Sequence, residues 1–145
     1  MGEADPTAVE RLAVTASDLV AALETNRATG RTAVLRVTPP FSARMRARLH
    51  VEGGEDYDDP RPVHVPPRAL VADEAPTYPT PAETEDRLRA DPEAEYTVDR
   101  HRQRHEAAVD EWRRELLAAV REEATVETQA GPVTVTVSLL GDAPE

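Results

Sequence analysis

Arginine side chains are concentrated in one segment of the sequence, where no carboxylate accompanies them. Residues 25–51 contain six arginines and no acid, a net charge of +6 within a chain whose formal charge is −11. Alternate side chains of a strand point to one face, so a hairpin of residues 32–38 with residues 42–52 would gather a cationic group on one side. Its members are Arg36, Arg44, Arg46, Arg48 and His50. Because the planar guanidinium binds carboxylate and phosphate in a bidentate manner, this face is a candidate site for an anion or an acidic partner.

Two interpretations of this cationic face remain open. It can dock a partner, or it can be a solvated face whose charges are paired internally, for example with the acidic residues 55–59. An acidic protein or a second copy of the chain is the favoured partner. Nucleic acid is a weaker candidate, because phosphate-driven affinity falls steeply with salt and Phe41 is the one aromatic residue nearby that could stack on bases.

A second candidate group is the pair His101 and His105, which are four residues apart on a predicted helix. This spacing can chelate a metal ion, with His50 or His64 and a carboxylate completing the site. The intervening residues lack the glutamate of the zinc-protease motif, so histidines at the polar end of an apolar helix face are the simpler interpretation. The metal protein or enzyme centred on this pair is therefore the alternative, and a non-enzymatic role is favoured.

Signatures of catalysis or cofactor binding are missing from the sequence. The acidic residues 55–59 lack the ligand spacing of an EF-hand, and neither a phosphate-binding glycine loop nor a Gly-x-Ser-x-Gly motif occurs. Thiolate chemistry and disulfides are excluded because the chain has no cysteine. We therefore predict no catalytic residue, no cofactor and no metal ligand.

The elements that must position these residues follow from hydrophobic periodicity and turn residues. Strands are predicted over residues 11–15, 32–38, 42–52, 62–66, 124–128 and 133–140, and helices from Ser17 to before Gly30, over 81–90 and over 98–123. This order predicts an α+β fold with a mostly antiparallel sheet and one long helix, in the C-terminal half, packed on it. We expect a single domain over residues 1–145, with an extended proline-rich linker at 73–81 and a frayed tail at 141–145.

Composition indicates the environment rather than the activity. All 17 basic residues are arginine, the charge is −11, and Leu, Val and Phe are few. This profile suits either a disordered chain or a folded protein at molar salt, where surface charges repel little because the Debye length is about 3 Å. The periodic apolar pattern favours the second interpretation. The N-terminus resembles no signal peptide and no segment is apolar enough to span a membrane, so a cytoplasmic protein that does not contact membranes is expected.

The segment from Thr32 to His50 (TAVLRVTPPFSARMRARLH), with the helix start at residues 97–112, resembles a family of small uncharacterised proteins of halophilic archaea. The resemblance covers most of the chain. It implies a saline habitat and a single domain, and it carries no assigned activity or functional residues.

Overall fold

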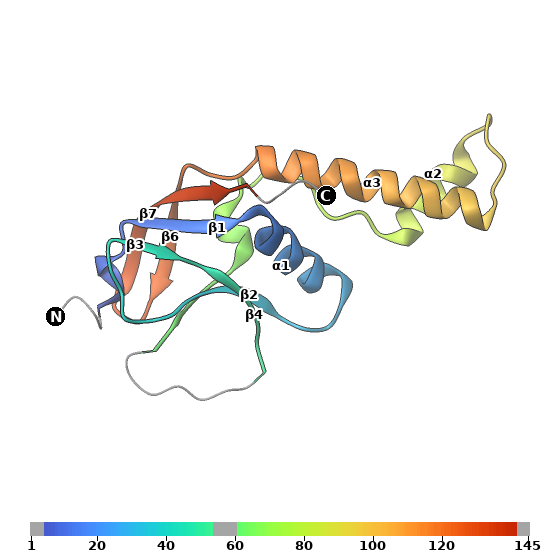
Figure 1. The fold of residues 1–145 in the computed structure, drawn as a ribbon. Helices are drawn as coiled ribbons and strands as arrows, with labels where there is room; N and C mark the ends of the chain where they lie inside the picture. Colours follow the sequence, from blue (N-terminus) through green and yellow to red (C-terminus); the bar gives the residue numbers. More distant parts are fainter. Residues whose placement is uncertain (1–4, 54–60, 142–145) are drawn as a thin grey trace. The chain divides into compact units, whose positions relative to one another are not determined.

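The computed structural model describes residues 5–53 and 61–141, which divide into two compact units (Figure 1). The first unit comprises the chain up to Asp73 together with the chain from Val120, and the second comprises Glu74–Ala119. The first unit contains all the strands and one α-helix, whereas the second is built from two α-helices. The predicted α+β class and the long helix are confirmed. Residues 55–59 and most of the predicted frayed tail lie outside the described residues.

Two sheets form the first unit. The strands are β1 (Arg11–Thr15), β2 (Ala33–Val37), β3 (Arg44–Arg46), β4 (Arg48–Val51), β5 (Val63–Val65), β6 (Glu123–Thr128) and β7 (Gly131–Leu140). One sheet has the order β3-β1-β7-β6 and the other the order β4-β2-β5. β1 runs parallel to both β3 and β7, and the other pairs are antiparallel. Antiparallel pairing therefore predominates, as predicted, and the parallel pairs all involve β1.

The predicted strand over residues 42–52 is wrong as a single element, because it bends at Ala47 and passes from one sheet to the other. Ala47 is fully buried, and its N–H donates to the carbonyl of Ala13 at 2.8 Å. The residues before it pair with β1 and those after it pair with β2. The sheets approach again where β5 packs against β6. A small alanine is suited to this bend because a larger side chain would have to displace packed neighbours.

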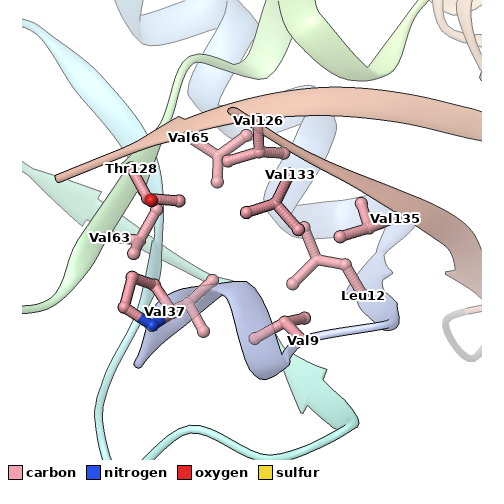
Figure 2. Close-up of a pocket in the computed structure, with 10 residues that line it drawn as sticks. Val9, Leu12, Val37, Val63, Val65, Val126, Thr128, Val133 and Val135 are labelled. Carbon is pink, nitrogen blue, oxygen red and sulfur yellow. The ribbon is translucent and has the colours of Figure 1, made fainter. Parts of the chain in front are cut away.

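Leucine and valine side chains fill the space between the two sheets. Helix α1 (Ala16–Ala28), which begins with Thr15 as its N-cap, buries Leu19, Val20 and Ala22 and packs against β1, β2 and β4. Figure 2 shows the apolar hollow that remains, into which the side chains of both sheets point. Its volume is about 20 Å³, which suffices for about one water molecule. The hollow is therefore an imperfection of packing, too small for a metabolite.

Short sequence signals account for the starts of both helices in the second unit. Helix α2 (Pro81–Ala90) begins with a capping box, in which Thr80 and Glu83 each accept the other's backbone N–H, and Pro81 is its first residue. Helix α3 (Val98–Ala118) begins with Thr97 as N-cap and packs against α2. It ends before the predicted residue 123. In the first unit, the next residues form a bridge between Val120 and Val71 and a hydrogen bond from Arg121 N to Leu70 O.

The predicted linker supplies part of the core of the second unit. Residues 75–80 have no regular secondary structure, but their backbone and side chains contact α3. The indole N–H of Trp112 donates to the carbonyl of Pro76 at 3.1 Å, and the ring of Tyr78 meets the indole edge-on at a centroid distance of 4.9 Å. Leu88 of α2 and Leu116 of α3 are also buried. The segment therefore lacks regular secondary structure but is packed against α3.

Candidate functional site

Three arginines project from the bend that joins β3 to β4. Arg44, Arg46 and Arg48 are all exposed, whereas Ala47 between them is buried. The alternation predicted from the sequence therefore continues through the bend, although the two strands belong to different sheets. We refer to Arg44, Arg46 and Arg48 as the arginine surface.

The neighbours of the arginine surface differ from those predicted. Arg36 lies opposite Arg48 in the β2–β4 ladder, as a hairpin requires. Arg44 instead lies opposite Arg11 of β1, whose guanidinium donates to Ser138 Oγ at 2.8 Å. The prediction that Arg36 shares one sheet face with all three arginines is therefore wrong, and Arg11 is a neighbour that sequence reasoning missed. A parallel pairing between β1 and a strand so distant in sequence leaves no local signal.

Most arginines of the second unit form ion pairs, whereas those of the arginine surface form none with the described residues. In that unit, five arginines lie within 4 Å of a carboxylate, in the pairs Arg89–Glu85, Arg102–Asp99, Arg104–Asp91, Arg113–Asp110 and Arg114–Glu111. In the first unit, Arg121 pairs with Asp73 at 3.0 Å. The side chains of Arg44, Arg46 and Arg48 form no ion pair or hydrogen bond within residues 5–53 and 61–141. The predicted internal partner, residues 55–59, lies outside that part of the chain.

Two histidines and a carboxylate continue this side of the β4-β2-β5 sheet beyond Arg48. His50 and Glu52 follow Arg48 at a spacing of two, and His64 of β5 lies opposite Arg36. The ring centroids of His50 and His64 are 5.4 Å apart, and Glu52 Oε2 lies 2.9 Å from His64 Nδ1. His50 is half-buried, as is Arg36. Of the predicted residues, Arg36, Arg48 and His50 therefore share one sheet, and Arg44 and Arg46 continue the charge around the bend.

The second candidate, the pair His101 and His105, is engaged in holding the two helices together. His101 Nε2 donates to the carbonyl of Pro81 at 2.9 Å, and His105 Nδ1 shares a hydrogen bond of 2.9 Å with Thr84 Oγ1. The ring centroids of the two histidines are 6.3 Å apart. Among the described residues, no group of three or more His, Asp or Glu side chains could hold a metal ion. Both histidines are therefore assigned a structural role between α2 and α3.

A groove between α2 and α3 is lined by charges of both signs. Arg87, Arg104, Glu83, Glu111 and Glu115 all border it. Several of these groups already interact with other residues of the second unit. Glu83 completes the capping box, Arg104 binds Asp91 and Glu111 pairs with Arg114. No set of like charges converges in the groove, so it offers weaker recognition chemistry than the arginine surface.

One protein family matches nearly the whole chain. A family model described as a domain of unknown function, DUF8009, matches residues 1–141. The chain belongs to the DUF8009 family. Searches of curated proteins and of solved structures gave no match to it. The function of this DUF8009 domain must therefore be argued from its own surface. No helix within the described part of the DUF8009 domain is both long and apolar enough to cross a membrane.

Proposed function

We propose that this protein is a small, non-enzymatic interaction protein that docks an acidic protein partner on the arginine surface, with Arg36 and His50 extending the contact area. The observation that carries the proposal is the exposure of Arg44, Arg46 and Arg48 without an ion pair inside the described chain. At molar salt the mutual repulsion of these arginines costs little, so they can stay exposed in the free protein and bind an anionic group at short range.

An acidic protein suits this surface better than nucleic acid. Arginine forks bind carboxylates through two parallel hydrogen bonds, and the described residues around the surface offer no exposed aromatic ring on which a base could stack, since Phe41 is buried. We further propose that the acidity of the chain, with its formal charge of −11, is an adaptation to a saline cytoplasm of the kind found in halophilic archaea. At molar salt, counterion release contributes little affinity for any polyanion, so binding must rest on direct pairing of the guanidinium groups with carboxylates.

The test compares two triple variants that remove the same charge from different places. Arg44→Gln, Arg46→Gln and Arg48→Gln remove the arginine surface, whereas Arg102→Gln, Arg113→Gln and Arg114→Gln remove arginines that carry intrahelical ion pairs. The probe is fluorescein-labelled poly-L-glutamate, measured by fluorescence anisotropy at about 1 M KCl. With each exposed ion pair contributing about 0.5 kcal/mol, loss of all three corresponds to about 1.5 kcal/mol, so the first variant should bind about tenfold more weakly, and the control should bind within about twofold of the wild type.

Two results would overturn the proposal. Equal losses in the two variants would show that the probe responds to net charge alone, and absence of binding by the wild type would remove the basis for an acidic partner. A single-stranded oligonucleotide of matched charge is the second probe. Tighter binding of the oligonucleotide than of poly-L-glutamate at the same salt concentration would show that the partner class is wrong.

A further inference from the structure

Strand β3, which carries Arg44 and Arg46, forms one edge of its sheet. The hydrogen bonds to its one neighbour, β1, fix which of its residues face inward. Arg11 N donates to Ala43 O at 2.8 Å, and Ala47 N donates to Ala13 O at 2.8 Å. In a parallel ladder the residues that bond to the neighbouring strand alternate with residues that face away from it. The backbone groups of Ala43, Met45 and Ala47 therefore face β1, and those of Arg44 and Arg46 face the open edge.

The open edge of β3 retains free hydrogen-bonding capacity. The carbonyl of Arg44 accepts from Ser42 Oγ at 3.1 Å. For Arg44 N–H and for both backbone groups of Arg46, the described residues provide no partner. The outer edge of β4 differs, because the N–H of Leu49 donates to the carboxylate of Asp18 at 3.2 Å. Helix α1 thus covers the outer edge of β4, whereas no described residue covers the outer edge of β3 at Arg46.

We propose that the acidic partner binds by adding an extended segment as a further strand on the open edge of β3. This inference rests on the proposed function and specifies the chemistry of the partner. Side chains opposite each other in a ladder lie about 5 Å apart on the same face. Arg44 and Arg46 are two residues apart, so they match acidic residues at alternate positions of the added strand. Backbone hydrogen bonds would provide affinity, and the paired charges would provide specificity.

The partner segment is defined further by the residue between the two arginines. Met45 points to the opposite face of β3 and is half-buried, so an apolar residue in the added strand would pack beside it. The expected pattern is therefore acidic, apolar, acidic. Because β3 has 3 residues, a partner strand of similar length is sufficient. A competing explanation is that charged side chains on a short edge strand prevent association with other strands, which proteins commonly do.

N-methylated peptides distinguish strand addition from docking through side chains alone. The parent probe is a fluorescein-labelled peptide of alternating glutamate and valine, and two further peptides carry N-methyl groups on either every glutamate or every valine. Only one of these sets of N–H groups can face β3 in a given strand orientation. We expect one methylated peptide to bind at least about tenfold more weakly, and the other to bind as the parent does.

The outcomes separate the two proposals. If both methylated peptides bind as the parent does, or both lose affinity equally, strand addition is wrong and docking through the arginine side chains stands. If the parent peptide itself fails to bind, the proposed function fails as well. The variant Arg44→Gln with Arg46→Gln should weaken binding of the parent by about fivefold, which verifies that the peptide is located at β3.

Amide hydrogen exchange provides a readout at the edge itself. The N–H of Arg46 faces away from β1, so its exchange should slow at least about tenfold when the parent peptide is bound. The N–H of Leu49, which already donates to Asp18, is the internal control and should change little. Unchanged exchange at Arg46 in a saturated complex would overturn the proposal. Protection that instead rises with protein concentration and without peptide would identify a second copy as the occupant, which would also overturn it.

Discussion

Replacing Trp112 by phenylalanine is expected to destabilise the second unit by about 2 kcal/mol. Trp112 is 4% exposed, and it is the largest side chain between α3 and the extended segment before α2. The substitution removes the indole N–H that donates to the carbonyl of Pro76 at 3.1 Å. It keeps an aromatic ring that can still meet Tyr78. The experiment therefore tests whether the extended segment is held by that hydrogen bond and by close packing.

The expected magnitude has two sources. Loss of a neutral hydrogen bond costs about 1 kcal/mol, and the half-buried position of Pro76 allows water to reach its carbonyl, which keeps the cost from rising further. The ring atoms that phenylalanine lacks cost about another 1 kcal/mol in lost burial and unfilled space. Trp112→Ala, which also loses the contact with Tyr78, should cost about 3–5 kcal/mol.

Hydrogen exchange of the α3 amides is the assay, because it reports the free energy of opening of this helix directly. Val98→Ala is the matched control. Val98 lies in the same helix but is 66% exposed, so its truncation should change the opening free energy by less than about 0.5 kcal/mol. If Trp112→Phe destabilises α3 no more than Val98→Ala does, the indole contact does not hold the extended segment, and the reasoning is refuted.

Two further predictions concern salt and pH. Lowering the salt concentration below roughly 0.5 M should loosen the fold as self-repulsion of the formal charge of −11 becomes unscreened; a far-UV circular dichroism spectrum unchanged down to low salt would contradict this. For Asp91, hydrogen bonds from the backbone N–H of Glu93 and from the Arg104 side chain hold the pKa below its ordinary value of 3.8. Its contribution to stability is therefore complete above that value and is lost as the pH falls through the lowered pKa. The stability difference between wild type and Asp91→Asn, measured by thermal denaturation, should accordingly shrink with acidification, and a difference independent of pH would argue against the hydrogen bonds.

Local signals in the sequence predicted the helices and most strands. The helices predicted to begin at residues 81 and 98 do so, with Thr80 and Thr97 as their N-caps. A hydroxyl that accepts from the first turn is a property of a few adjacent residues. Strand β1 covers the predicted residues, Arg11–Thr15. The turn between β6 and β7 contains Gly131 with φ of 110°, a backbone conformation that favours glycine. Each of these features depends on neighbours within about five residues.

Pairing between distant segments was not predictable in the same way. The alternation from residue 42 to residue 52 was interpreted as one strand, because polar and apolar residues alternate in the sequence without a break at Ala47. In the structure, burial alternates in β3 but not in β4. The change of sheet at Ala47 follows the pairing of the residues before it with β1 and of those after it with β2. Parallel pairing of β1 with β3 and β7 has no counterpart in local composition. For the same reason Arg11 was missed as a neighbour of the arginine surface, and Arg36 was placed on one sheet face with all three of its arginines although it shares a sheet with Arg48 alone.

The arginine surface is suited to recognition over short distances. At about 1 M salt the Debye length is about 3 Å, so the repulsion among Arg44, Arg46 and Arg48 costs little and long-range attraction of a partner is largely lost. Selectivity under those conditions must come from contacts shorter than the Debye length, which are bidentate guanidinium–carboxylate pairs and backbone hydrogen bonds. The open edge of β3 provides the backbone groups beside two of the guanidinium groups, in one strand. A surface that retained only its charges would lose most of its selectivity in the proposed saline cytoplasm, whereas a strand edge bearing arginines would keep it.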